Sequence, residues 1–127
     1  MEAVLFVEYP KCSTCKKAKK WLDEHGIPYT DRHIVEDNPS SSELKSWQEK
    51  SGLPLRRFFN TSGMLYRELG VKKRFEDGMT DEEAFELLAS SGMLVKRPLI
   101  IGKEYVLVGF KEAQWRKLCD KAGVISK

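Results

Sequence analysis

The sequence predicts a single α/β or α+β domain, and three observations predict it. A short apolar run near the N-terminus leads through a tight loop into an amphipathic helix. Two β-rich runs near the C-terminus are separated by a short loop that contains glycine. Capping signals place helices between these two regions. The resulting order, β-α-β, helices, β-β-α, combines a parallel unit with a hairpin and is typical of α/β or α+β domains whose helices cover one sheet.

The opening unit is a strand, a loop and a helix. Residues 2–8 are largely apolar, with β-branched and aromatic members that favour a buried strand, which Pro10 ends. The helix is expected to extend to about His25, with Gly26 as its C-terminal cap. Its apolar positions recur at three- and four-residue steps: Ala18, Trp21, Leu22 and His25.

A helical segment is expected between the second and third strands, over about residues 38–95. The second strand covers about 27–35, and short helical turns are expected over 53–69, joined by residues 60–63. Two capping boxes predict the longer helices: Ser40-x-x-Glu43, with an end near Gly52, and Thr80-x-x-Glu83, with an end near Gly92.

The C-terminal part is predicted to be a hairpin and a helix. Residues 99–101 and 105–108 are β-rich and are joined by a loop that begins with Gly102. A last helix is expected from Lys111 to Gly123. Its inward-facing residues are predicted to be Ala113, Trp115, Leu118, Cys119 and Ala122.

Composition excludes several classes of protein. The chain has 127 residues, which suits one domain, and its 41% apolar and 32% charged content does not indicate disorder. A net charge of +3 spread over both signs gives no reason to expect direct nucleic-acid binding. No apolar run approaches the roughly 20 residues that span a bilayer, and the N-terminus does not resemble a signal peptide. We expect a cytoplasmic monomer with reduced thiols and no bound cofactor.

Cys12 and Cys15 form a Cys-x-x-Cys pair at the predicted junction of strand and helix. The unpaired N–H groups and the positive end of the helix dipole favour the thiolate of Cys12. Cys15, one turn later, faces Cys12 and can close a disulfide after Cys12 has attacked an oxidised partner. The pattern therefore predicts an attacking Cys12 and a resolving Cys15.

Three other interpretations of the pair stay open. Structural zinc needs two further ligands, and only Cys119, His25 and His33 remain, without ligand spacing. A structural disulfide is disfavoured in a reducing compartment. Cys15 could also simply pack in the core with Ala18. No metal site is expected, and Cys119 is interpreted as a core residue.

Arg97-Pro98 directly precedes the third predicted strand. A trans proline at a strand start is the ordinary interpretation, and a cis bond is the functional one. In the functional interpretation the turn places Arg97 beside the thiol, where its fork of donors can hold an anion or a partner's chain.

These motifs together resemble the ArsC/Spx family. The resemblance rests on the segments Tyr9–Ala18, Gly26–Tyr29 and Leu94–Ile100, on the helical insertion, and on Phe58–Met64, which is similar to the YusI-type ArsC-like branch. It implies a thioredoxin-like fold with a four-stranded mixed sheet flanked by helices. It also implies a cis Pro98, an attacking Cys12, and arsenate reduction with glutathione and glutaredoxin as electron donors.

The resemblance also implies an oxyanion site of three arginines, of which only Arg97 matches clearly. The cations that could compensate are Arg56, Arg57, Lys96 and Lys111, although nothing in the sequence shows that they do. The second position falls at Asn60 and the third near Gly109. Losing two cations should weaken dianion binding by several kcal/mol, at roughly 1.5–3 kcal/mol for each charged hydrogen bond. The sequence therefore argues against arsenate as the true substrate. Further contacts to an oxyanion or substrate are expected from Ser13, Thr14, Asn60 and Lys96.

Two functional hypotheses follow. The first is a thiol–disulfide oxidoreductase in which Cys12 attacks, Cys15 resolves and Arg97 steers a small oxyanion or disulfide substrate, with glutathione, glutaredoxin or thioredoxin as reductant. The second is a Spx-like redox switch that binds RNA polymerase, with Gly52 at the position where that regulator uses a glycine against its partner. The simpler interpretation of Gly52 is a helix C-cap.

Overall fold

The computed structural model describes the backbone of residues 3–121 and the side chains of residues 3–117. The chain forms two compact units, which are described separately. The first unit contains the two ends of the chain, up to His33 and from Arg97 onward, and the second is Ile34–Lys96. None of the helices within residues 3–121 is both long and apolar enough to cross a membrane.

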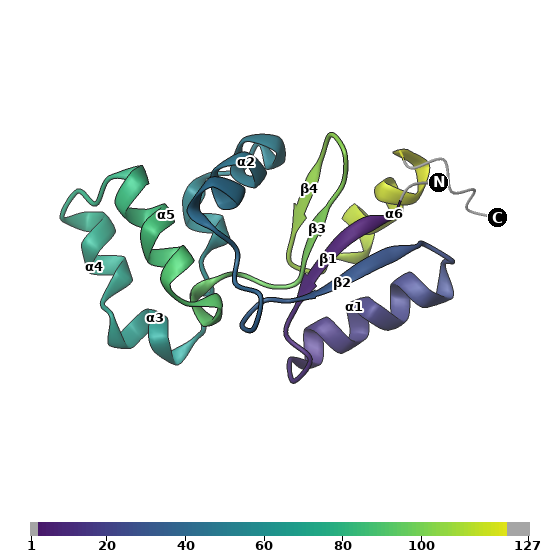
Figure 1. Cartoon of the computed structure of the whole chain (residues 1–127), viewed down its shortest axis with the longest axis horizontal. Helices are drawn as coiled ribbons and strands as arrows, with labels where there is room; N and C mark the ends of the chain where they lie inside the picture. The colour runs from purple at the N-terminus through teal and green to yellow at the C-terminus, as the bar shows by residue number, and fades with distance from the viewer. Residues whose placement is uncertain (1–2, 122–127) are drawn as a thin grey trace. The chain divides into compact units, whose positions relative to one another are not determined.

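The first unit contains the four-stranded mixed sheet that the sequence predicts. Its strands are β1 (Val4–Glu8), β2 (Tyr29–His33), β3 (Leu99–Ile101) and β4 (Val106–Val108), in the spatial order β2-β1-β3-β4 (Figure 1). The β1 and β2 strands are parallel, because α1 (Ser13–Glu24) connects them, whereas β3 pairs antiparallel with both β1 and β4. The sheet therefore places the start of α1 directly after the end of β1.

Two helices, α1 and α6 (Glu112–Lys121), pack against the same apolar cluster of the sheet. Trp21 of α1 and Trp115 of α6 contact each other edge to face, with ring centroids 5.6 Å apart. Both tryptophans are buried beside Phe6 of β1 and Ile100 of β3. Burial of large aromatic rings is a main contribution to stability in a small unit.

The second unit is mainly helical. It contains α2 (Ser41–Ser51), α3 (Met64–Glu68), α4 (Val71–Glu76), α5 (Asp81–Ser90) and two 3-10 helices, Leu55–Phe58 and Gly92–Leu94 (Figure 1). Both predicted capping boxes are confirmed, at the starts of α2 and α5. Gly52 ends α2 with a left-handed conformation, φ 68°, which confirms its interpretation as a C-cap.

The structure corrects three details of the sequence analysis. The second strand is shorter than predicted, covering Tyr29–His33 only. The short helix α4 was not predicted, because its sequence carries no capping signal and buries only Val71. Ala113 is exposed, since it lies about 200° around α6 from the buried Trp115. The predicted inward positions of Leu118, Cys119 and Ala122 fall outside the described side chains.

Candidate active site

Cys12 is the N-cap residue of α1, with an extended backbone at φ −84° and ψ 124°. Its N–H donates to the carbonyl of Tyr9 at 2.9 Å, and its carbonyl accepts from the N–H of Lys16 at 3.0 Å. The side chain is partly exposed. Cys12 is thus held firmly by its backbone while its sulfur stays accessible at the positive end of the helix.

The surroundings of Cys12 favour its thiolate. Burial opposes ionisation, but the pKa of Cys12 still lies below its ordinary value because several donors face the sulfur. These donors are the backbone N–H and the S–H of Cys15, the guanidinium of Arg97 and the backbone N–H of Thr14. Because the thiolate is the nucleophile, this arrangement prepares Cys12 to attack.

Cys15 has the opposite chemistry. It is fully buried, and this burial raises the pKa of its thiol to about 12. The backbone N–H of Tyr9 and the charge of Arg97 favour ionisation, but the hydrogen bond to Cys12 and the negative charge of Cys12 oppose it. Cys15 therefore keeps its proton and donates a hydrogen bond to the Cys12 sulfur, so that the two sulfurs are adjacent and differently protonated.

Arg97 reaches the thiol from the other end of the chain. The Arg97–Pro98 peptide bond is cis, as the resemblance implied. The guanidinium lies over the ring of Tyr9, 5.1 Å from its centroid, while Nε and Nη1 are buried and have no hydrogen-bond partner among the described residues. Stacking on an aromatic ring therefore helps to hold Arg97 and leaves donors free for a ligand.

The other residues that were predicted to contact an oxyanion or substrate belong to both units of the chain. Ser13 and Thr14 are exposed in the first turn of α1, next to Cys12. Asn60 and Lys96 belong to the second unit, and their predicted substrate contacts stay predictions. Gly109 has a positive φ of 79° and donates its N–H to the carbonyl of Pro98 at 2.8 Å. An arginine there would be strained, so the backbone itself disfavours the third cation of an arsenate site.

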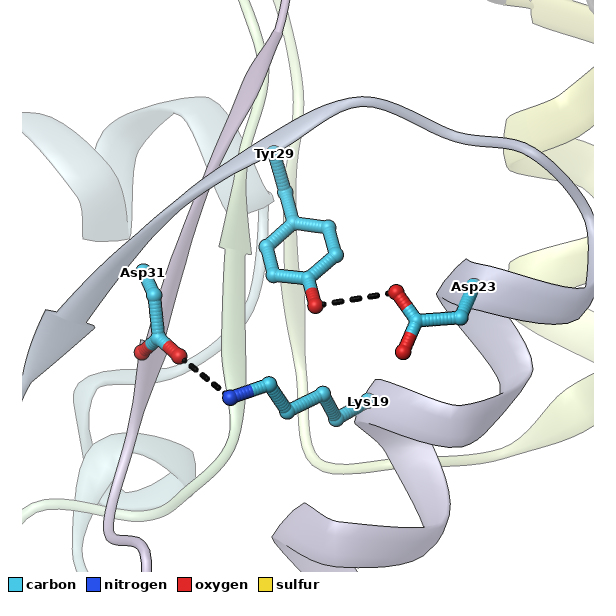
Figure 2. Close-up of polar contacts among 4 residues, drawn as sticks. All are labelled: Lys19, Asp23, Tyr29 and Asp31. Atoms are coloured by element: carbon cyan, nitrogen blue, oxygen red, sulfur yellow. Dashed lines mark hydrogen bonds and ion pairs between the residues drawn. The ribbon is translucent and has the colours of Figure 1, made fainter.

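A second polar cluster lies on the same unit, where α1 crosses the two parallel strands. Lys19 of α1 donates to Asp31 of β2 at 2.8 Å, and Tyr29 donates to Asp23 at 3.0 Å (Figure 2). Glu8 of β1 is only 4% exposed and donates a hydrogen bond to Asp31. Burial, together with the hydrogen bond to Asp31 and its negative charge, raises the pKa of Glu8 to about 7 although Lys19 opposes the shift.

Three residues of this cluster, Glu8, Lys19 and Asp31, line a cavity of about 400 Å³. The cavity is lined by Glu8, Pro10, Lys16, Lys19, Asp31 and His33. Within residues 3–117 no group of three or more His, Cys, Asp or Glu residues is arranged to hold a metal ion. The cavity therefore carries both acidic and basic groups, and it lies beside the first turns of the helix that begins at Cys12.

Comparison with known proteins identifies the family. The ArsC family model matches residues 7–118, which is most of the chain. The chain belongs to the ArsC family. The structure and this match together confirm the predicted thioredoxin-like fold.

Individual relatives of this ArsC-family chain include uncharacterised and regulatory proteins. The YusI protein of Bacillus subtilis is 56% identical over 115 residues, covering 91% of this chain and 97% of that protein. The global transcriptional regulator Spx of Listeria innocua is 31% identical over 112 residues, covering 88% of this chain and 83% of the regulator. These matches confirm the predicted relationship to both YusI and Spx.

Two solved structures are similar to this chain along most of its length. An ArsC family related protein from Bacteroides fragilis is 55% identical, with a TM-score of 0.88 and coverage of 92% of this chain and 98% of that one. A possible arsenate reductase from Streptococcus mutans is 43% identical, with a TM-score of 0.79 and coverage of 87% and 93%.

Sequence reasoning missed two features of this ArsC-family site. Tyr9 belongs to the segment Tyr9–Ala18 on which the family resemblance rests. Its contact with Arg97 could not be predicted, because the two residues are 88 positions apart in the sequence. Glu8 carried a usable signal, because a glutamate that ends an apolar strand and alternates with the buried Phe6 is predicted to face the core. The parallel pairing of β1 and β2 brings its partner Asp31 onto the neighbouring strand, opposite Phe6.

Replacing Glu8 with glutamine should change how stability depends on pH. The folded pKa of Glu8, about 7, lies above its ordinary value of 4.5, so the protonated form is favoured by folding. The contribution of Glu8 to the free energy of unfolding is therefore complete below pH 4.5 and is lost as the pH rises through 7. Relative to wild type, Glu8→Gln should therefore gain about 2 kcal/mol in free energy of unfolding between pH 5 and pH 8. Urea unfolding at several pH values measures this difference.

The matched control for Glu8 is Glu24→Gln, at an exposed position at the end of α1. Its unfolding free energy should follow that of wild type across the same pH range. Parallel curves for wild type and Glu8→Gln would show that Glu8 and Asp31 do not share a proton in the folded state.

Proposed function

We propose that this protein is a cytoplasmic thiol–disulfide oxidoreductase of the ArsC family, with Cys12 as nucleophile and Cys15 as resolving thiol. The observation that carries the proposal is the contrast between the two sulfurs. Cys12 is partly exposed with a lowered pKa, whereas the adjacent Cys15 is buried with a pKa of about 12. An exposed thiolate beside a protonated thiol is the arrangement that two-step disulfide exchange needs.

The reaction proceeds in two exchange steps. The Cys12 thiolate attacks one sulfur of a substrate disulfide, so that a mixed disulfide forms and the other substrate sulfur leaves as a thiolate that takes a proton from water. Cys15 then attacks the sulfur of Cys12, and the proton that it loses is taken up by the departing substrate thiolate. The second substrate thiolate leaves, and a Cys12–Cys15 disulfide remains. Two electrons have passed from the dithiol to the substrate.

A reductant must return two electrons to close the cycle. Two glutathione molecules, or the dithiol of a glutaredoxin or thioredoxin, can reduce the Cys12–Cys15 disulfide by the same exchange chemistry and leave as a disulfide. Oxidation removes the negative charge of the Cys12 sulfur, so Arg97, which faces that sulfur, loses its anionic partner. Arg97 therefore stabilises the reduced enzyme and orients the incoming substrate.

A disulfide fits this site better than arsenate. Among the described side chains, Arg97 is the cation that faces the Cys12 sulfur, and Gly109 occupies a position where the backbone disfavours an arginine. A doubly charged oxyanion would therefore be held by one guanidinium and the N–H groups of the first turn of α1. A neutral disulfide needs only an accessible thiolate and a donor for the leaving sulfur.

A substrate comparison tests the proposal. The purified chain with glutathione and glutathione reductase should reduce a mixed disulfide of glutathione or a peptide, and should reduce arsenate at least about 100-fold more slowly, as expected when two charged contacts of roughly 1.5–3 kcal/mol each are missing. Consumption of NADPH measures both reactions. Efficient arsenate turnover with no disulfide turnover would overturn the proposal.

A second candidate is a redox-sensing regulator, favoured by the similarity to Spx. The relative is named a global transcriptional regulator and is 31% identical over most of both chains. In this case the partner proposed for this chain is RNA polymerase, and the same dithiol would act as a sensor. Purified RNA polymerase should then bind the immobilised chain differently in its oxidised and reduced forms. Absence of binding in both forms would exclude this candidate.

A further inference from the structure

Four exposed lysines lie within eight residues of Cys12 along the chain. They are Lys11 in the loop before α1 and Lys16, Lys17 and Lys20 on the helix. Within the described part of the chain none of the four makes an ion pair, whereas Lys19 is held by Asp31. The thiol that starts the proposed reaction is therefore bordered by cations that no acidic group of the described chain neutralises.

The three helical lysines form one continuous stripe. At about 100° per residue, Lys16, Lys17 and Lys20 lie within a third of the helix circumference. The opposite side is buried and carries Cys15, Ala18 and Leu22. From Cys12 to Lys20 the stripe is about 12 Å long, at roughly 1.5 Å per residue. It ends in the acidic pair Asp23 and Glu24, so the positive charge is confined to the half of α1 next to the thiol.

The stripe continues into the 400 Å³ cavity. Lys16 belongs to both, and the cavity wall also includes Pro10 from the loop before Cys12. The remaining lining groups are Glu8, Lys19, Asp31 and His33. A chain that follows the lysines therefore meets a recess at Lys16, one helical turn after Cys12, that can receive one of its side chains.

We propose that Lys11, Lys16, Lys17 and Lys20 form a docking surface for an acidic polypeptide segment that carries the disulfide attacked by Cys12. This inference rests on the proposed function, because it names the partner of that same thiol. Four cations along about 12 Å match the carboxylates of an extended acidic segment of about four residues, at roughly 3.3 Å per residue. Charges at the rim of such a site mainly raise the rate of association.

The probe is a set of three twelve-residue peptides, each with one cysteine as a mixed disulfide with thionitrobenzoate. Four glutamates, four glutamines or four lysines follow the cysteine. Cys12 attacks the peptide sulfur and releases thionitrobenzoate, the better leaving group, whose absorbance reports the rate. Cys15 then displaces the peptide thiolate. The reduced full-length chain is the only reductant.

The acidic peptide should react at least about ten-fold faster than the glutamine peptide at low ionic strength, and the lysine peptide should be slowest. The difference should shrink to about two-fold at 0.5 M salt, because screening removes the steering. The triple variant K16E/K17E/K20E should reverse the order of the acidic and basic peptides. Conservative K16R/K17R/K20R should keep the wild-type order.

The control variant is Lys103→Glu, which makes a single charge reversal at an exposed loop position of the same unit. It should leave the ratio of acidic to neutral rates unchanged. The ratio of the rates with the acidic and the neutral peptide is the decisive readout, since a general change in Cys12 reactivity would lower the rates with all three peptides equally. Equal rates for the three peptides would overturn the docking surface while leaving the proposed function intact. Failure of even the neutral peptide to react through Cys12 would instead reject the proposed function.

Discussion

Replacing Cys12 with serine should abolish disulfide reduction, with a fall in kcat of at least about 1000-fold. A serine hydroxyl stays protonated at neutral pH, and the donors from Cys15, Thr14 and Arg97 face a thiolate that would no longer exist. The NADPH-coupled assay with a peptide mixed disulfide measures this loss.

Cys119→Ser is the matched control for the Cys12 variant, since it makes the same change at a cysteine outside the proposed chemistry. It should retain most of the wild-type rate. Substantial turnover by Cys12→Ser, or an equal loss in Cys119→Ser, would contradict the assignment of Cys12 as nucleophile.

Replacing Arg97 with glutamine should raise the pKa of Cys12 and slow its reaction by about 10- to 100-fold at neutral pH. Burial already opposes ionisation of Cys12, and the guanidinium is one of the few groups that counteract it. Loss of one charged hydrogen bond is worth about 1.5–3 kcal/mol, which corresponds to that range of rates. The rate of alkylation by iodoacetamide as a function of pH gives the pKa directly.

Arg97→Lys separates the charge from the geometry of the guanidinium. A lysine keeps the positive charge but cannot present a planar fork or stack as well on Tyr9, so an intermediate pKa is expected. An alkylation profile of Arg97→Gln that superimposes on that of wild type would show that Arg97 does not stabilise the thiolate.

The parts of the fold that local chemistry determines were predictable from the sequence. The capping boxes at Ser40 and Thr80 and the glycine cap at Gly52 each depend on residues within one turn, and all three are confirmed. The strand β1 and the hairpin of β3 and β4 were predicted for the same reason, from short apolar runs bounded by turns.

Long-range contacts in the candidate site were only partly predictable. A cis bond before Pro98 came from the family resemblance, since base rates for the residues alone favour trans. The shared proton of Glu8 and Asp31 depends on the register of two parallel strands, which no local pattern specifies. The burial of Cys15 was one of the interpretations considered, and it proves compatible with the resolving role because burial keeps its thiol protonated.

The central claim is that Cys12 attacks and Cys15 resolves, and trapping the intermediate tests it most directly. Cys15→Ser, mixed with an equimolar peptide disulfide, should accumulate a covalent adduct because no second thiol displaces the peptide from Cys12. Intact-protein and fragment mass spectrometry should find the peptide on Cys12, whereas the wild-type chain should give a Cys12–Cys15 disulfide and free peptide. A wild-type chain that retains the peptide adduct, or a variant that releases the peptide as fast as wild type, would contradict the mechanism.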